Sequence, residues 1–160
     1  MVQFRGNVQT RLGKLEAGEV AATFLACAGL NRLGMADLIT RAIPVDEMLP
    51  AVAQGAIGIE IRGEDDCTRE LLQPLSHAET EITVAAERGF LSALDGSCRT
   101  PLAGHAVLDG DEVQFRGMAL SRDGSAIWQA ERSGPSGDAE QLGIDAATEV
   151  KAAAGDRLFA

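Results

Sequence analysis

The chain has 160 residues, with 14 Lys and Arg against 24 Asp and Glu, so its formal charge at pH 7 is −10. This balance excludes a nucleic-acid-binding protein, because contacts to the phosphate backbone need an excess of basic side chains. A hydrophobic fraction of 46% excludes a disordered chain, which buries too little apolar surface to offset its ordering entropy. We therefore expect one folded domain or two small ones.

Targeting and redox signals point to a cytoplasmic protein without membrane contact. The first residues contain no apolar run of the length that a signal peptide needs. The longest apolar run, Val20–Leu30, is about half as long as a membrane-spanning helix. Three cysteines at wide spacing and two histidines predict neither a disulfide framework nor a metal site.

The basic residues are unevenly chosen and unevenly placed. Only Lys14 and Lys151 are lysines, and all the other basic residues are arginines. Arg5, Arg11 and Lys14 fall in the first fifteen residues, where no acidic residue occurs. Two interpretations remain open at this point: solvated charges on a helix face, or a site for a small anion, which the planar guanidinium suits.

The first half of the chain predicts an αβ region with few strands. Asn7 predicts the N-cap of a helix that runs to Glu16 and stops at Gly18. Val20–Ala28 is apolar throughout, which predicts a buried strand with Cys27 in the core. The remaining elements predicted here are a turn at Gly29–Gly34, a short helix at Met35–Ala42, a loop between Pro44 and Pro50, a strand at Ala56–Arg62, and a helix begun by Asp65 or Asp66.

The second half predicts a compact α-β-β-β-α domain, in which a three-stranded antiparallel sheet lies against two helices. A break at Pro74–His77 separates it from the first half, and Trp128 is expected in its core. Its predicted elements are a helix from Ala78 to Leu94 ended by Gly96, strands at Leu102–Leu108, Val113–Leu120 and Ala126–Glu131 joined by Asp109-Gly110 and Asp123-Gly124, and a helix from Asp138 to Ala154.

Cys98 is the strongest candidate for chemistry. It follows a helix end in a loop, beside Arg99, whose charge favours the thiolate. The alternatives are a reactive thiol and an ordinary loop cysteine; because no base is evident nearby, a reactive thiol would be a covalent attachment point. Cys67 follows three acidic residues and is expected to be an unreactive surface thiol. Glu87 and Arg88 are expected to tie the long helix to a neighbouring element.

The stretch Glu87–Ala103, ERGFLSALDGSCRTPLA, resembles the signature of the porphobilinogen deaminase family, also called hydroxymethylbilane synthase. Three more segments resemble the same family in the same order: Arg5–Leu12, Ala28–Gly34 and Leu49–Glu60. The resemblance extends over nearly all of this chain but only about the C-terminal half of the family's length. It implies a transferase that joins four porphobilinogen molecules head to tail, with release of ammonia, into hydroxymethylbilane in haem biosynthesis.

The resemblance also implies roles for individual residues. A dipyrromethane cofactor is expected on Cys98 through a thioether, and the carboxylates of the pyrroles are expected to meet Arg5 and Arg11. Arg32 matches a further arginine of the family's active cleft, and Gln54 matches a residue near the cofactor that serves as a polar contact. Porphobilinogen and the growing polypyrrole are the implied partners, and the full-length family member is expected to be a monomer.

The fold implied is an incomplete periplasmic-binding-like αβ region followed by the small α-β-β-β-α domain. Residues 1–50 are assigned to part of a second αβ domain, 51–76 to a segment that returns to a first domain, and 77–160 to the cofactor-bearing C-terminal domain. The catalytic aspartate belongs to the family's first domain, so no catalytic residue is assigned here and the chain alone is expected to be inactive. The alternative is a non-enzymatic αβ module that binds a small organic acid through Arg5 and Arg11.

Overall fold

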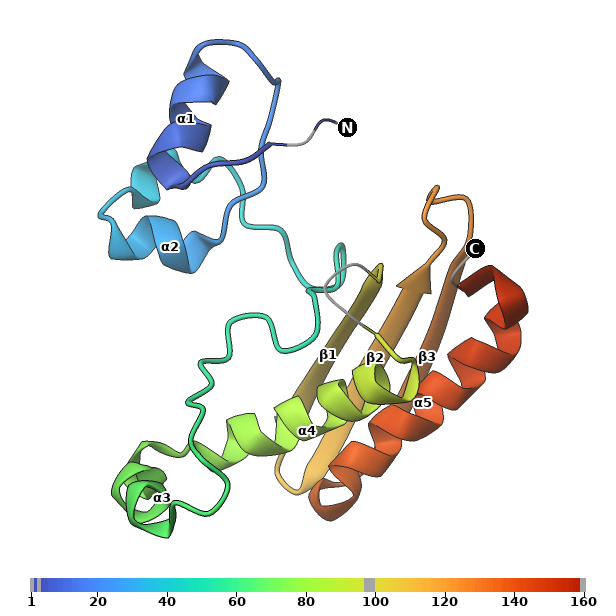
Figure 1. Ribbon diagram of the computed structural model, residues 1–160. Helices are drawn as coiled ribbons and strands as arrows, with labels where there is room; N and C mark the ends of the chain where they lie inside the picture. The colour runs from blue at the N-terminus through green and yellow to red at the C-terminus, as the bar shows by residue number, and fades with distance from the viewer. Residues whose placement is uncertain (1, 3, 97–99, 159–160) are drawn as a thin grey trace. The chain divides into compact units, whose positions relative to one another are not determined.

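The computed structural model describes residues 2, 4–96 and 100–158 (Figure 1). The chain forms two compact units, Met1–Pro44 and Val45–Ala160. Within the described ranges, no helix is both long and apolar enough to cross a membrane.

The first unit holds two short helices, α1 (Val8–Glu16) and α2 (Cys27–Arg32), and a 3-10 helix at Ala36–Leu38. The predicted N-cap of α1 is confirmed, because Asn7 Oδ1 accepts a hydrogen bond from the Thr10 amide at 2.9 Å. Gly6 precedes this cap at φ +130°, and a Cβ there would lie 2.7 Å from Thr10 Cγ2. Only glycine fits this position without a rearrangement.

Three of the elements predicted in this unit are wrong. Residues 20–26 form no strand, and Cys27, only half-buried, begins α2 instead of packing in a core. The predicted turn at Gly29–Gly34 lies largely within the same helix, and the predicted helix at Met35–Ala42 is reduced to the 3-10 turn. A strand needs a neighbouring strand for its backbone groups, and the described residues of this unit provide none.

Residues 56–62 of the second unit form no strand, so the strand predicted at Ala56–Arg62 is also wrong. Ile57 and Ile59 are 87% and 55% exposed. No described strand lies beside this alternating segment, so its backbone has no ladder to join. The next helix, α3 (Asp66–Leu72), is confirmed with Asp65 as its cap, and a 3-10 turn at Gln73–Leu75 occupies the predicted break.

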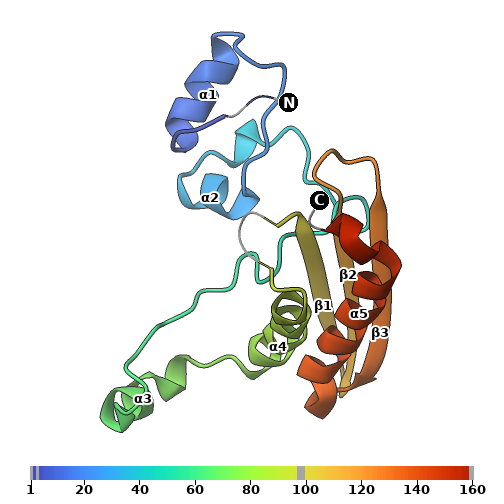
Figure 2. The same ribbon diagram turned by 45° about the vertical axis from the view of Figure 1, so that its right-hand side comes forward.

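The predicted α-β-β-β-α domain is confirmed in order and type. The helices α4 (Ala78–Ala93) and α5 (Ala139–Ala154) flank β1 (Leu102–Asp109), β2 (Glu112–Leu120) and β3 (Ile127–Pro135). The strands form one antiparallel sheet in the order β1-β2-β3. Both helices pack side by side on one face of this sheet (Figures 1 and 2).

The core lies between the sheet and these helices. Phe90 of α4 and Phe115 of β2 are fully buried, with ring centroids 5.4 Å apart. Gly143 allows α5 to approach α4 closely, because a Cβ there would collide with the Ala86 carbonyl oxygen and lie 2.8 Å from the Phe90 amide nitrogen. Trp128 is buried in the same core, as predicted.

The two predicted hairpin turns are confirmed by backbone geometry. Gly110 and Gly124 have φ values of +63° and +72°, which glycine adopts without strain. In the second turn, Asp123 Oδ1 accepts hydrogen bonds from the hydroxyls of Ser121 and Ser125 and from the Ser125 amide.

Candidate functional site

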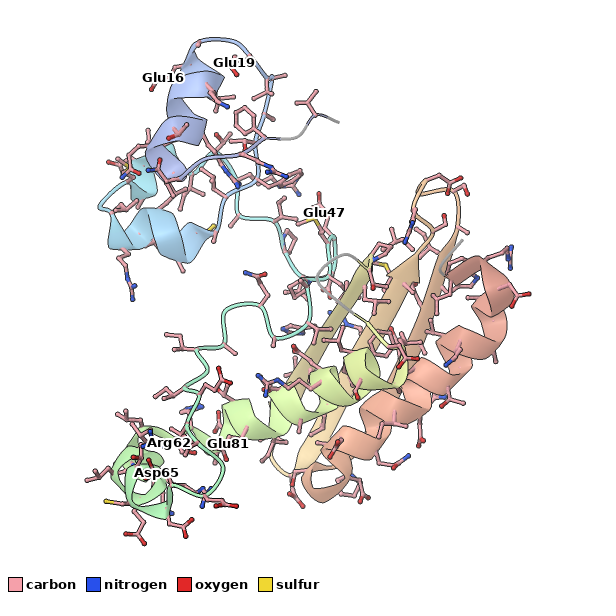
Figure 3. The ribbon with its side chains drawn as sticks, viewed as in Figure 1. Glu16, Glu19, Glu47, Arg62, Asp65 and Glu81 are labelled. Atoms are coloured by element: carbon pink, nitrogen blue, oxygen red, sulfur yellow. The ribbon has the colours of Figure 1, made fainter. Side chains whose placement is uncertain are left out.

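Two of the predicted arginines lie around the N-terminal end of α1. Arg5 is exposed, and Arg11 Nε donates a hydrogen bond to the Gly6 carbonyl at 3.0 Å. The first turn of α1 contains no acidic residue, whereas Glu16 and Glu19 lie at and beyond its opposite end (Figure 3). This end of the helix therefore combines two guanidinium groups with the positive end of the helix dipole.

Arg32 is the last residue of α2 and is exposed. It belongs to the same compact unit as Arg5 and Arg11. Among the described side chains, none of these three arginines forms an ion pair with an acidic residue.

Gln54 lies in the second unit, in a turn formed by residues 51–56. Its amide donates to the Ala51 carbonyl at 3.0 Å, and the Ala56 amide donates to the Ala53 carbonyl at 3.1 Å. The Gln54 side chain is exposed. The structure thus places three of the predicted residues in one unit and the fourth in the other.

Cys98 lies outside the described residues, as does Arg99. The described residues before it end α4: Asp95 has φ +50°, and the Gly96 amide donates to the Leu91 carbonyl at 2.9 Å. Cys67 is exposed, as predicted. Cys27 and Cys67 are both free thiols.

The prediction that Glu87 ties α4 to a neighbour is confirmed. Its carboxylate accepts a hydrogen bond from the Ala53 amide at 2.6 Å and one from the Ala106 amide at 3.0 Å. Sequence reasoning did not find the partners, because they are backbone amides distant along the chain. Arg88, by contrast, is exposed.

Further polar groups lie away from the predicted site. His77, to which we assigned no role from the sequence, caps α4 by accepting from the Thr80 amide through Nδ1. The hollow lined by Glu60, Asp65 and Thr68 is open, and within it Arg62 pairs with Asp65 at 2.6 Å (Figure 3). Hydrogen bonds from Thr68 and Arg62 lower the pKa of the Asp65 carboxyl.

No group of three or more His, Cys, Asp or Glu side chains could hold a metal ion in the part of the chain that the structure describes. The N-terminal end of α1 suits a ligand with carboxylates, because Arg11 lies beside it and its first turn holds no acidic residue.

Comparison with known proteins matches two family models to this chain. Residues 1–70 match "Porphobilinogen deaminase, dipyromethane cofactor binding domain", and residues 81–152 match "Porphobilinogen deaminase, C-terminal domain". The chain belongs to the porphobilinogen deaminase family. The break between the two matches falls where α3 gives way to α4.

Several porphobilinogen deaminases are about half identical to this chain. The protein of Nitrobacter hamburgensis is 52% identical over 97% of this chain, and that of Paracoccus denitrificans is 53% identical over 99% of it. A chloroplastic porphobilinogen deaminase of Oryza sativa subsp. japonica is 53% identical over 99% of this chain. The chain spans about half the length of these relatives, 49%, 51% and 45% respectively.

Proposed function

We propose that this chain is the C-terminal part of a hydroxymethylbilane synthase, which joins four porphobilinogen molecules head to tail and releases ammonia. The observation that carries the proposal is the match of both porphobilinogen deaminase models, in order, over residues 1–70 and 81–152. The proposal makes porphobilinogen the substrate and a monomer the complete enzyme. The free thiols Cys27 and Cys67 favour a reducing compartment, the cytoplasm.

Arg5, Arg11 and Arg32 supply the positive charge that the pyrrole carboxylates need. Each pyrrole unit carries an acetate and a propionate, so negative charge accumulates as the chain of pyrroles grows. Guanidinium groups bind carboxylates in two-pronged geometry and remain charged at every physiological pH. The absence of acidic residues from the first turn of α1 supports this role, because no internal carboxylate competes there.

Cys98 is proposed to hold the dipyrromethane cofactor through a thioether. The bound group supplies an acceptor pyrrole, onto which substrate units are added. The contribution of this chain would be a soft thiolate that forms a C–S bond to the methylene carbon of an aminomethylpyrrole, whose C–N bond breaks with loss of ammonia. Arg99 lies next to Cys98 in sequence and would favour the ionised form of the thiol. Gln54 is proposed as a neutral polar contact to the same group.

The unpaired elements of this chain are proposed to complete domains together with the rest of the protein. Residues 1–50 would form part of a periplasmic-binding-like αβ domain, and 51–76 would return to the first domain. Residues 77–160 would bear the cofactor covalently through Cys98, while residues 1–70, which match the family model named for cofactor binding, would supply non-covalent contacts to it. The segment 56–62 supports this arrangement, because it forms no strand in this chain and its two exposed isoleucines, Ile57 and Ile59, suit the edge of another sheet. The catalytic aspartate would come from the first domain.

The test is to co-express this chain with the N-terminal half of the Nitrobacter hamburgensis relative. We expect a dipyrromethane adduct by intact mass, a pyrrole colour reaction, and turnover of porphobilinogen. Cys98→Ala should abolish all three, whereas the matched control Cys67→Ala should leave them unchanged. A reconstituted pair that carries the adduct on a residue other than Cys98, or that lacks both adduct and turnover, would contradict the proposal and favour a non-enzymatic module that binds an organic acid.

The arginines are tested in the same reconstituted pair. Arg11→Ala and Arg5→Ala should each lower kcat/KM for porphobilinogen at least ~10-fold, since each removes a charge-assisted contact to a carboxylate. Arg122→Ala, in the hairpin between β2 and β3, is the control that removes the same charge elsewhere. Equal effects of all three substitutions would show that net charge alone matters.

A further inference from the structure

The strand β1 is an edge strand, and two amides on its free side are hydrogen-bonded to groups outside the sheet. In the order β1-β2-β3, one side of β1 has no strand partner. On that side the Gly104 amide donates to the Pro50 carbonyl at 3.0 Å, and the Ala106 amide donates to Glu87 Oε1 at 3.0 Å. An open edge is a template for pairing with another chain. A loop carbonyl and a carboxylate therefore take the place of the missing strand.

The second oxygen of Glu87 reaches the turn that carries Gln54. Oε2 accepts from the Ala53 amide at 2.6 Å, and the side chain is only 7% exposed. A buried carboxylate is tolerated when its oxygens are satisfied. Within the described residues, both of its hydrogen bonds come from backbone amides and none from a cation. One side chain of α4 thus joins β1 to the residue before Gln54.

The turn itself is in a conformation that needs such support. Ala53 has φ +57°, in the left-handed region that a non-glycine residue enters only where its surroundings hold it. Next to it, Val52 packs against the core of the domain, and further back Asp46 pairs with Arg116 of β2 at 2.8 Å. These contacts dock the segment 46–53 on the C-terminal domain, although the sequence assigned residues 46–50 to a different domain from 77–160.

We infer that Glu87 is a positioning residue, which holds the Gln54 turn on the C-terminal domain by accepting hydrogen bonds from the Ala53 amide and from the Ala106 amide on the free edge of β1. The effect of Glu87 on the cofactor rests on the proposed function, in which Gln54 contacts dipyrromethane. The carboxylate is required rather than an amide, since both of its oxygens accept from N–H groups. Glu87→Gln replaces one acceptor by an NH₂ donor, so at least one of the two amides loses its partner.

Hydrogen exchange of single amides, followed by NMR on the full chain, tests the inference. In the unchanged chain the Ala53 amide should exchange at least ~10-fold more slowly than the unpaired Ile57 amide, after correction for intrinsic rates. In Glu87→Gln, Ala53 or Ala106 should exchange at least ~10-fold faster, with Ala147 and Val150 of α5 within about two-fold of their original rates. Glu70→Gln, which removes an exposed carboxylate from α3, is the matched control.

Two results would overturn the inference. The first is an Ala53 amide that exchanges as fast as the Ile57 amide in the unchanged chain. This measurement does not depend on whether a variant folds. The other is equal acceleration of all amides in Glu87→Gln, α5 included, because this would mean that Glu87 serves overall stability alone.

A second readout separates this inference from the proposed function. In the pair reconstituted with the Nitrobacter hamburgensis half, Glu87→Gln should lower the fraction of protein that carries the pyrrole adduct at least ~3-fold relative to Glu70→Gln. Protection of Ala53 without any adduct in the unchanged pair would support Glu87 as the tie and contradict the proposed function. A normal adduct with an unprotected Ala53 amide would support the proposed function and contradict the role of Glu87 as the tie.

Discussion

The N-terminal unit and the C-terminal domain both contain long apolar stretches, but they bury them to different extents. Among the described residues of the N-terminal unit, Leu30 alone is buried, and Phe24 is 68% exposed. In the C-terminal domain, apolar residues from α4, α5 and all three strands form one core. The comparison teaches that an apolar run forms a stable element only when a second surface is present to cover it.

The largest expected effect is the loss of an aromatic ring from the core. Phe90→Ala should lower the free energy of unfolding of the C-terminal domain by about 3–5 kcal/mol, because it removes a fully buried ring that packs against Phe115. Phe24→Ala makes the same substitution in the N-terminal unit, where the ring is exposed. It should change the free energy of unfolding by less than about 0.5 kcal/mol. Urea unfolding followed by circular dichroism measures both, and similar losses would show that the units share one core.

Glycine substitutions compare how closely the helices of each region pack. Gly143→Ala should cost about 1–3 kcal/mol or more, because the new Cβ would overlap the Ala86 carbonyl at the contact between α4 and α5. In Gly13→Ala, the new Cβ in α1 meets no atom within 4 Å. The substitution should favour the helix by up to about 1 kcal/mol and so raise the helix content slightly. Thermal unfolding and far-UV circular dichroism give the two readouts. A destabilised Gly13→Ala would reveal packing on that face of α1.

A smaller effect is expected from the cations that lie over aromatic rings in the two regions. Arg157 Cζ lies 5.4 Å from the centre of the Trp128 ring, and Lys14 Nζ lies 5.5 Å from that of Phe4. Arg157→Gln should lower the stability of the C-terminal domain by about 0.5–1 kcal/mol, whereas Lys14→Gln should leave it unchanged. Urea midpoints compare the two variants. A larger effect of Lys14→Gln would contradict the independence of the C-terminal core.

The smallest effect concerns pH and one polar side chain in each region: Asp123 in the hairpin turn between β2 and β3, and Asn7 at the start of α1. Hydrogen bonds from the Ser121 hydroxyl and the Ser125 amide lower the Asp123 pKa from 3.8 to about 2. The folded-state pKa is depressed, so the stabilisation is present above about pH 4 and is lost as the pH falls towards 2. NMR titration and urea midpoints in this window should show the loss, and Asp123→Asn should remove it. Asn7, the neutral cap of α1, predicts no such dependence; an Asp123 that titrates near 3.8 would refute the prediction.

Elements with local signals could be predicted from the sequence. The helices α4 and α5 have apolar faces at helical spacing, and the Asp-Gly pairs specify tight hairpin turns, so the order of the C-terminal domain followed directly. Caps were equally local: Asn7 and Asp65 accept from an amide three residues on. The ends of the helices and strands of the C-terminal domain differ from the predicted ends by a few residues at most. The largest difference is at β3, which was predicted to end at Glu131 and continues to Pro135.

The strands predicted at Val20–Ala28 and Ala56–Arg62 failed because a strand is not a local structure. Its backbone hydrogen bonds come from another segment, and no described segment supplies them here. The apolar run was therefore misleading about the secondary structure of this segment. Its last two residues, Cys27 and Ala28, begin the helix α2 (Cys27–Arg32) instead.

The candidate site divides in the same way. Sequence motifs selected Arg5, Arg11 and Arg32, and an arginine remains a cation wherever it lies. No pattern indicated that the Ala53 amide would meet Glu87, which is 34 residues away in the chain. Such contacts depend on how the segment 46–53 folds back on β1, which only the packed domain specifies.

The sequence by itself determined the family, the local helices and turns, and the arginine-rich start of an acidic chain, because these depend on residue identity and short spacing. The tertiary structure decided which apolar segments are covered, which edge of the sheet is closed, and that Glu87 joins the Gln54 turn to the C-terminal domain. These features depend on surfaces and hydrogen-bond partners brought together from distant parts of the chain, and no local pattern encodes them.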